Sequence, residues 1–445
     1  VDTRRDHGGL IFIDLRDRWG ITQVVFNPAT SKELHTQAEA LRSEFSVQAG
    51  GEVVKRPPGT ENLKIPTGAV EVAARELVIF NASPPPPFEI SDKVEVSEEI
   101  RLKYRFLDLR RPSMMRNLAT RHEITRIARE YFSGLGFLEI ETPYLTKSTP
   151  EGARDFLVPA RFAPGEFYAL PQSPQLFKQI FMVSGVDRYF QIVRCFRDED
   201  LRADRQPEHT QIDVEMSFIG EEDILRVIEH LIARVVRGVC GMEVAAPFLR
   251  MPYAEAMNRF GSDKPDLRFG MELHDITEIL RGSTSKIFEE TFAKEGTARG
   301  LALPRGAALS RKDLDELVQV AKDFGAPGLA WFKVEASIES PMKKFFKEDQ
   351  LTRLAAACGA HKGDLILVVA ADWHTACAAL GALRLRLAER FEMIPKDRLS
   401  LLWVVDFPLF EWNEEEKRVQ PCHHPFTAPK EDALDLLEAE PLKVH

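Results

Sequence analysis

The chain has few cysteines, and they lack the spacing that a metal site or a disulfide framework needs. Its five cysteines are odd in number and widely separated, and no two of them form a Cys-x-x-Cys pair. This pattern indicates neither a structural zinc ion nor a set of disulfides. It is typical of a protein of the reducing cytosol, so we expect a cytoplasmic location.

Long apolar runs and an excess of basic residues are also absent. No run of apolar residues is long enough to span a bilayer, and no signal peptide opens the chain, so we expect no membrane association. The formal net charge is −10. This charge excludes bulk attraction to nucleic acid, and any such contact requires a local basic patch.

The first part of the chain is typical of a small β-barrel. Residues 1–82 combine five short strand patterns with one helix over Ser31–Ser46, which favours a closed barrel of the OB type. Four consecutive prolines then predict a stiff, extended linker over residues 83–96. The five predicted strands are Leu10–Leu15, Ile21–Phe26, Glu52–Arg56, Gly68–Val72 and Glu76–Asn81.

The rest of the chain alternates strand and helix patterns and divides into three stretches. Residues 97–265 open with a basic helical stretch, Arg101–Arg129, and reach a predicted strand at Phe137–Pro143. Residues 266–395 are predicted to be an inserted α+β domain, and residues 396–445 resume the preceding domain with an apolar strand over Ser400–Phe410. The insert has predicted helices at Lys312–Phe324, Glu348–Cys358 and Thr375–Phe391, and strands at Gly328–Val334 and Asp364–Ala370.

The segment Gln191–Phe218 has the clearest functional pattern. Two apolar strands flank a highly charged loop, and period-2 alternation puts Gln211, Asp213 and Glu215 on one strand face. Arg197 offers a planar, permanently charged fork that matches phosphate oxygens. The pattern predicts a site for a polyanion, a metal and an ammonium group, whereas the alternative is a weak surface ion pair between Arg197 and Glu199.

Two other segments place polar residues at loops and helix starts. Proline and glycine force a loop at Thr149–Phe156, which presents Glu151 for an amino group; the alternative is an ordinary polar turn. Ser173 is expected to cap a helix with Pro174 at its first position. Lys178 then lies one turn in, near Gln175, where it can bind a carboxylate unless it is a solvated surface lysine.

A histidine loop and the barrel carry the remaining candidates. His423 and His424 are adjacent, and adjacent side chains do not face one ligand, so hydrogen bonds to a small substrate are favoured over a metal pair. In the barrel, an exposed Phe12 can stack a base, a contact worth about 1–3 kcal/mol. Gln23 and Glu71 can then read base edges; the alternative is that Phe12 belongs to the core.

Taken in order, these motifs resemble those of the bacterial-type aspartyl-tRNA synthetases, which are class II enzymes. The motifs are TPEGARDF, QSPQLFKQ, FRDEDLRADRQPE, TQIDVE and HHPFTAP. The resemblance implies a multidomain α/β and β protein: an N-terminal OB-fold anticodon-binding barrel, a class II catalytic domain on an antiparallel sheet, and an inserted α+β domain. It identifies the strand ending at Pro143 as motif 1, at a homodimer interface, and Gln191–Phe218 as motif 2.

The resemblance also implies a role for each matching residue. Arg197 is the catalytic residue, which holds the α-phosphate of ATP beside the amino-acid carboxylate. ATP is a substrate and Mg²⁺ its companion ion, and no metal ligand is expected in this chain. The implied groups are Glu151, Ser173, Gln175, Lys178, Arg197, Asp213, His423 and His424 for aspartate; Arg197, Glu199 and Gln206 for ATP; and Arg5, Phe12, Gln23 and Glu71 for the anticodon.

His7 and Gly59 resemble the residues of members that charge both tRNA-Asp and tRNA-Asn, which makes both tRNAs expected partners. Nothing after His424 resembles class II motif 3, and the N-terminus lies inside the first expected barrel strand, so a fragment is expected and its own activity is left open. Two alternatives stay open: an asparagine or lysine enzyme of the same subclass, or a non-catalytic tRNA-binding protein.

Overall fold

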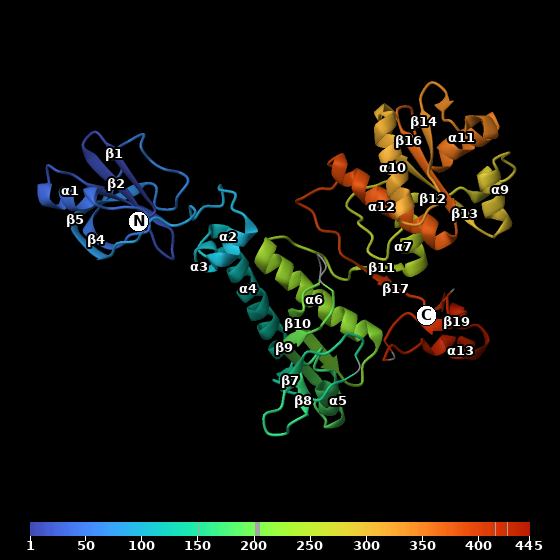
Figure 1. Ribbon diagram of the computed structural model, residues 1–445, viewed down its shortest axis with the longest axis horizontal. Coiled ribbons are helices and arrows are strands. Elements are labelled where there is room, and N and C mark those ends of the chain that lie inside the picture. The colour runs from blue at the N-terminus through green and yellow to red at the C-terminus, as the bar shows by residue number, and fades with distance from the viewer. Residues whose placement is uncertain (150, 201–204, 414, 425) are drawn as a thin grey trace. The chain divides into compact units, whose positions relative to one another are not determined.

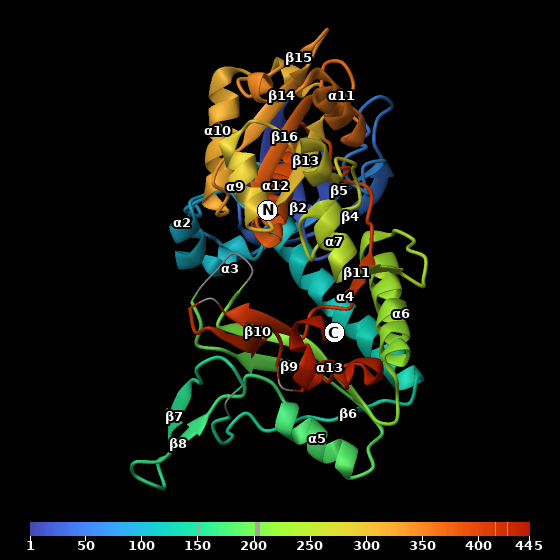
Figure 2. The ribbon, with the colours of Figure 1, turned by 90° about the vertical axis from the view of Figure 1, so that its right-hand side faces the viewer.

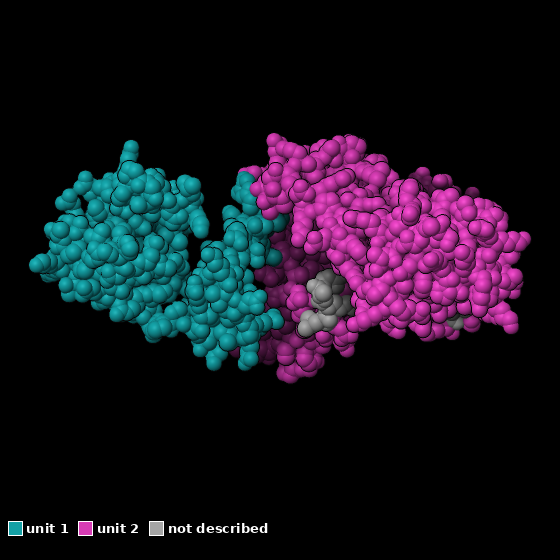
Figure 3. Space-filling view, turned by 90° about the horizontal axis from the view of Figure 1, so that it is seen from above, with its two compact units in different colours: residues 1–126 teal, residues 127–445 magenta. Residues whose placement is uncertain are grey.

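The structure is a computed structural model, which describes every residue of the chain except 150, 201–204, 414 and 425. The chain divides into two compact units, Val1–Arg126 and Ile127–His445, coloured separately in Figure 3. Within the described residues, no helix is both long and apolar enough to cross a membrane.

The first unit begins with a five-stranded barrel of the predicted OB type (Figure 1). The strand order is β1-β2-β3-β5-β4, and only the β3–β5 pair is parallel. Ile11, Ile13 and Phe26 are almost fully buried in its core. The elements are β1 (Thr3–His7), β2 (Leu10–Arg16), β3 (Ile21–Phe26), α1 (Lys32–Glu39), β4 (Ser46–Lys55) and β5 (Val70–Asn81).

The barrel differs from the expected elements in three places. The helix predicted over Ser31–Ser46 ends at Glu39, and Glu44 adopts a φ of +66°, which a continuous helix cannot contain. The two strands predicted at Gly68–Val72 and Glu76–Asn81 form one strand, β5, with a register irregularity in its partner β4 at Gly50 and Gly51. Strand β1 is absent from the five strands that the pattern predicted, because its residues are mostly polar, although the resemblance implied a barrel strand at the N-terminus.

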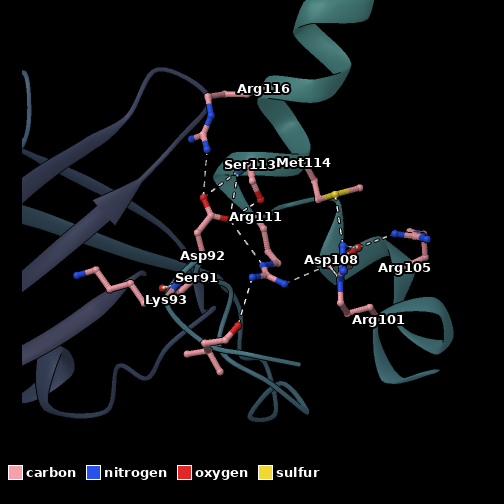
Figure 4. A network of polar contacts seen from close by, with 11 residues as sticks. Ser91, Asp92, Lys93, Arg101, Arg105, Asp108, Arg111, Ser113, Met114 and Arg116 are labelled. Atoms are coloured by element: carbon pink, nitrogen blue, oxygen red, sulfur yellow. Dashed lines mark hydrogen bonds and ion pairs between the residues drawn. The ribbon is translucent and has the colours of Figure 1, made fainter. Parts of the chain in front are cut away.

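Three helices follow the barrel instead of one continuous basic helix: α2 (Glu98–Lys103), α3 (Arg105–Asp108) and α4 (Pro112–Gly134). Asp108 is fully buried, and hydrogen bonds from Arg101 and then Arg105 hold the pKa of its carboxyl below the usual range (Figure 4). Asp92 accepts hydrogen bonds from Ser113 at the start of α4. Arg111 and Arg116 also pair with Asp92. These two basic residues therefore tie the linker to the start of α4, whereas Arg101 and Arg105 hold α2 and α3 together.

The second unit holds the sheet that positions the main candidate site. Its order is β10-β9-β6, with β9 and β10 antiparallel and β6 parallel to β9. The predicted strand Phe137–Pro143 is reduced to β6, only two residues long. Nearby elements are β6 (Leu138–Glu139), β7 (Leu157–Pro159), β8 (Phe167–Ala169), α5 (Gln175–Val183), β9 (Arg188–Phe196), β10 (Glu208–Met216) and α6 (Glu221–Cys240).

The predicted insert has its own antiparallel sheet, ordered β12-β13-β16-β14-β15, with apolar clusters on both faces of β16. Buried Arg384 donates hydrogen bonds to four carbonyl oxygens between Asp266 and Met271, and burial lowers its pKa to about 10. Helix α7 (Tyr253–Phe260) precedes the insert. The helices of the insert are α8 (Thr277–Leu280), α9 (Lys286–Ala293), α10 (Arg311–Asp323), α11 (Glu348–Ala357) and α12 (Trp373–Arg390), and its strands are β12 (Leu273–Asp275), β13 (Thr297–Leu303), β14 (Ala330–Val334), β15 (Ile338–Glu339) and β16 (Leu365–Ala371).

The chain then returns beside the segment that precedes the insert. Strand β17 (Leu402–Val405) pairs in parallel with β11 (Leu249–Pro252). The strand predicted over Ser400–Phe410 stops here, because Asp406 adopts a φ of +58° before Pro408. The last elements are β18 (Phe410–Asn413), β19 (Arg418–Pro421) and α13 (Leu436–Ala439), and short 3₁₀ turns occur at Gly306–Ala308, Lys343–Phe345, Glu431–Ala433 and Pro441–Lys443.

Buried Glu229 of α6 joins these distant segments. Its Oε1 accepts hydrogen bonds from the Phe248 backbone at 3.1 Å, from Trp403 Nε1 at 2.8 Å and from Arg250. Burial alone would raise the pKa of this carboxyl, but the hydrogen bonds from Arg250, Trp403 and Phe248 lower it below the usual range. The Glu229 carboxylate therefore holds α6, β11 and β17 together.

Candidate functional site

The two faces of the β9–β10 pair differ as the alternation predicts. Phe190 and Val214 pack into a core with Phe132, whose ring stacks on Phe190 at 5.0 Å. The opposite face carries polar groups in register, with Asp213 opposite Gln191 and Glu215 opposite Tyr189 (Figure 2 shows β9 and β10 side by side). The predicted face of Gln211, Asp213 and Glu215 therefore exists.

Helix α5 covers this polar face and brings a lysine to it. Phe181 of α5 lies 5.6 Å from the Tyr189 ring, between ring centroids. Lys178 is 9% exposed, so the alternative of a solvated surface lysine is wrong. Its Nζ lies 2.8 Å from Asp213 Oδ1 and 3.3 Å from Glu215 Oε2.

Two buried atoms on this face lack hydrogen-bond partners. They are the second carboxylate oxygen of Asp213, Oδ2, and the Nε of Arg197, which follows β9. Buried polar atoms are normally hydrogen-bonded, so each unpaired one requires an explanation. An unpaired acceptor and an unpaired cationic donor match a ligand that carries both an ammonium group and an anionic group.

The polar face also holds two groups in their neutral forms. Burial raises the pKa of the Tyr189 hydroxyl, and the Asp213 carboxylate raises it further. Burial likewise raises the pKa of the Cys195 thiol to about 11. Neither group is therefore a nucleophile at neutral pH, and the charge of the face comes from its lysine, its arginine and its carboxylates.

The loop that carries Glu151 is fixed against the start of α5. Glu151 Oε2 accepts a hydrogen bond from Ser173 Oγ at 2.8 Å. Buried Gln172 exchanges hydrogen bonds with the backbone of Ala153, at 3.1 and 2.8 Å, in the manner of a strand pair. The loop is thus more than an ordinary polar turn, although Pro150 lies outside the described residues.

Helix α5 begins one residue later than predicted, at Gln175, so Pro174 takes the capping position. The Ser173 hydroxyl still accepts a hydrogen bond from the Gln175 backbone N–H at 3.2 Å. Ser173 therefore links the helix start to Glu151, while Gln175 lies in the same first turn as Lys178.

The loop between β9 and β10 is described in part, because residues 201–204 lie outside the described residues. Glu199 accepts a hydrogen bond from Arg205 at 2.8 Å, and both line a cavity of about 300 Å³ with Gly152 and Arg154. Gln206 is exposed. The structure thus brings Glu199 beside the Glu151 loop, and the ion pair of Arg197 with Glu199 considered from sequence does not form.

His423 and His424 stand apart from these groups in their described contacts. The His423 ring lies 5.8 Å from that of Phe407, and His424 contacts Phe426, with ring centroids 4.4 Å apart. These contacts lie within the C-terminal segment, where Pro425 is outside the described residues. None of the contacts found among the described residues joins either histidine to Lys178 or Asp213.

A second candidate site is a cavity of about 680 Å³ on the barrel. Phe12 lies on the β2 face opposite buried Ile11 and Ile13, so it is not a core residue. The alternative that Phe12 belongs to the core is therefore wrong. The cavity is lined by Arg5, Asp6, His7, Leu10, Phe12, Gln23, Val25, Arg56, Pro57, Thr60, Glu61, Asn62 and Glu71.

A row of hydrogen bonds crosses one wall of the barrel cavity. Arg5 donates to Asp14 at 2.7 Å and to Gln23 at 3.1 Å, and Gln23 Nε2 donates to Glu71 at 2.7 Å. Strand pairing sets this row, because Asp14 is opposite Gln23. The four residues predicted from the resemblance thus line one cavity.

His7 and Gly59 lie at turns around the barrel cavity. His7 ends β1 before a two-residue hairpin whose glycines both have positive φ. Gly59 has a φ of +85° in a turn closed by a hydrogen bond from Thr60 N to Pro57 O, as a type II turn requires. Gly59 therefore has a conformational reason to be glycine in addition to the expected role.

Sequence reasoning missed Arg56. It is 7% exposed, donates from Nε to the Val70 carbonyl at 3.1 Å, and has a buried Nη2 without a hydrogen-bond partner. It lines the same cavity as Phe12. A basic residue at the end of a strand, before the Pro57-Pro58 turn, was the only signal, and it did not show that the side chain turns inward.

Comparison with known families assigns both units. The family described as "tRNA synthetases class II (D, K and N)" matches residues 97–444, and the "OB-fold nucleic acid binding domain" matches residues 1–80. Among the described residues, no group of three or more His, Cys, Asp or Glu side chains could hold a metal ion.

Curated relatives match over the whole chain. One from Caldanaerobacter subterraneus subsp. tengcongensis, named "Aspartate--tRNA(Asp/Asn) ligase", is 54% identical over 100% of this chain and 75% of its own length. One of the same name from Persephonella marina is 53% identical over 98% of this chain and 73% of its own length. This chain thus spans about three quarters of their length.

A solved asparaginyl-tRNA synthetase from Pyrococcus horikoshii, complexed with asparaginyl-adenylate, has a TM-score of 0.51 and 19% identity. It covers 86% of this chain and 91% of its own. At this identity, the likeness shows the fold alone.

Proposed function

This chain belongs to the class II tRNA synthetases of the D, K and N group, and on that premise we propose that it ligates L-aspartate to tRNA through an aspartyl-adenylate. The observation that carries the proposal is the set of charges on the β9–β10 face. Lys178 is an ammonium group suited to a side-chain carboxylate, and the unpaired Asp213 oxygen is suited to an α-ammonium. The relatives' printed names support aspartate over asparagine and lysine.

In the proposed reaction, the aspartate α-carboxylate attacks the α-phosphorus of ATP, and pyrophosphate leaves. The terminal ribose hydroxyl of tRNA then attacks the carbonyl carbon of the adenylate, the bond to phosphate breaks, and AMP leaves. No protein base is needed, so the side chains act by position and charge. Arg197 compensates the phosphate charge, Asp213 holds the ammonium group, and Glu151, Ser173 and Gln175 frame the amino acid.

ATP is proposed as a substrate that arrives with Mg²⁺, with Glu199 and Gln206 near the nucleotide. The described residues do not supply a carboxylate cluster that fits the ion. We therefore assign none of these residues as a ligand of Mg²⁺. His423 and His424 are proposed to act only if their loop approaches the amino acid.

The barrel is proposed to read the anticodon, with Phe12 stacking a base and Arg5, Gln23 and Glu71 offering hydrogen bonds. The printed names of the relatives include both tRNA-Asp and tRNA-Asn, which supports charging of both by this chain. We test this with the full natural chain, tRNA-Asp and tRNA-Asn transcripts and labelled aspartate. Both transcripts are expected to be aspartylated, and charging of tRNA-Asp alone contradicts the dual specificity.

The amino acid is tested separately, by amino-acid-dependent exchange of pyrophosphate into ATP. Aspartate is expected to support exchange, whereas asparagine and lysine are not. Exchange with asparagine instead selects the sister enzyme, and binding of tRNA without any exchange selects the non-catalytic alternative.

A homodimer is proposed from exposed apolar side chains at motif 1, including Leu138 at 56% and Leu145 at 54% exposure. Light scattering of the full natural chain is expected to give twice the monomer mass. The five cysteines are all free thiols, which supports the reducing cytosol as the proposed location. The boundaries at residues 82, 96, 265 and 395 also stay a proposal; the family matches, which cover residues 1–80 and 97–444, support the first two.

A further inference from the structure

Two carboxylates share the single ammonium group of Lys178, and they are not equivalent. Asp213 is the closer one, at 2.8 Å, and its side chain is 10% exposed. Glu215 is farther, at 3.3 Å, and its side chain is 29% exposed. Both project from the same face of β10, two residues apart.

The two carboxylates also differ in what else they can bind. Asp213 has a second oxygen that is buried and unpaired, so it is committed to the interior of the site. Glu215 has a longer side chain and access to solvent. Its carboxylate can therefore leave Lys178 with the loss of only the small free energy of a partly exposed ion pair. A carboxylate that enters from a ligand therefore replaces Glu215 more readily than Asp213.

We propose that Glu215 is the displaceable counter-ion of Lys178: it holds the ammonium group in place while the site is empty and yields it to the side-chain carboxylate of aspartate. This inference rests on the proposed function and adds a positioning residue to it. Three carboxylates around one ammonium group repel one another, so binding of aspartate favours departure of the most exposed one, Glu215.

The proposal gives the two carboxylates opposite effects on aspartate binding. In Glu215→Gln, aspartate no longer competes with a charge, so its KM is expected to fall about three- to fivefold with kcat nearly unchanged, the scale of a partly exposed ion pair. In Asp213→Asn, the α-ammonium group of aspartate loses its proposed partner, and the KM for aspartate is expected to rise about tenfold or more. A purely structural role for Glu215 predicts the reverse sign, because a misplaced Lys178 would weaken aspartate binding.

The test is aspartate-dependent pyrophosphate exchange by the full natural chain, with KM and kcat determined separately and the thermal midpoint measured for each variant. Glu215→Asp keeps the charge and is expected to restore the wild-type KM. Glu208→Gln is the matched control, because Glu208 lies on the same strand but pairs with exposed Arg194.

Succinate provides a second readout, since it has the carboxylates without the ammonium group. It is expected to inhibit Glu215→Gln more strongly than wild type. An unchanged or higher KM in Glu215→Gln, at an unchanged thermal midpoint, overturns the proposal. Absence of aspartate-dependent exchange in wild type contradicts the proposed function instead.

Discussion

The barrel cavity and the β9–β10 face are both built on strand faces that point away from a core, yet they treat polar groups differently. In the cavity, Arg5, Gln23 and Glu71 are joined in one row of hydrogen bonds. On the β9–β10 face, Asp213 and Arg197 each keep a buried atom without a partner.

The difference follows from the ligands proposed for each site. Bases are neutral and carry donors and acceptors. The side chains of the row can therefore exchange their internal hydrogen bonds for hydrogen bonds to a base at little cost in free energy. Aspartate and ATP are charged, and a charge in a partly buried site needs a fixed opposite charge. The chemical site keeps unpaired buried atoms of both signs, whereas the described lining of the reading site combines a satisfied polar row with one unpaired donor, Nη2 of Arg56.

The largest expected effect comes from removing the cation of the chemical site. In Arg197→Ala, aspartate-dependent pyrophosphate exchange is expected to fall about 10²–10³-fold, the typical effect of losing one group that stabilises developing charge. Binding of tRNA should remain. Arg194→Ala is the control, because Arg194 lies on the same strand but is exposed and pairs with Glu208. Equal losses in both variants would contradict the assignment of Arg197.

An intermediate effect is expected from the aromatic group of the reading site. Phe12→Ala should weaken tRNA binding about 10- to 100-fold, as for the loss of one base–aromatic stack worth about 1–3 kcal/mol. Pyrophosphate exchange, which needs no tRNA, should not change. Trp19→Ala removes a more exposed aromatic side chain of the same barrel, 81% exposed and outside the cavity lining, and should leave tRNA binding intact. Filter binding of a tRNA transcript measures both variants.

Alternation predicted the polar face of β10, whose apolar residues recur every second position, so the shared face of Asp213 and Glu215 could be read from the sequence. In β2, residues 10–13 are all apolar, so the sequence left open whether Phe12 points outward or belongs to the core. The burial of Lys178 could not be read in this way, because it depends on how α5 packs against β9 and β10. The roles of the site residues came from resemblance and stay predictions.

Backbone geometry accounts for most of the errors in the fold. The helix after Ser31 was predicted too long because nothing local shows that Glu44 adopts a positive φ. The strand after Ser400 was predicted too long for the same reason at Asp406. Strand β1 was missed because its outward residues are charged and its partner, β2, supplies the apolar side of the pair.

Arg56 gives the smallest expected effect and the sharpest test of the comparison, because among the described lining residues of the cavity it alone has a buried donor without a partner. Since Arg56 is 7% exposed, we expect its guanidinium to meet a base edge inside the cavity and not a phosphate on the surface. Arg56→Gln should weaken cognate tRNA binding about tenfold, the low end for one arginine–base contact, and relax discrimination against one altered anticodon base. The dependence of binding on salt should keep its slope, whereas loss of a phosphate contact would reduce the slope by about one. Arg75→Gln, in which an exposed arginine on β5 loses its pairing with Glu52, is the control. A reduced slope in Arg56→Gln would make Arg56 a phosphate contact, and the unpaired cations of the two sites would then serve the same purpose, compensation of phosphate charge.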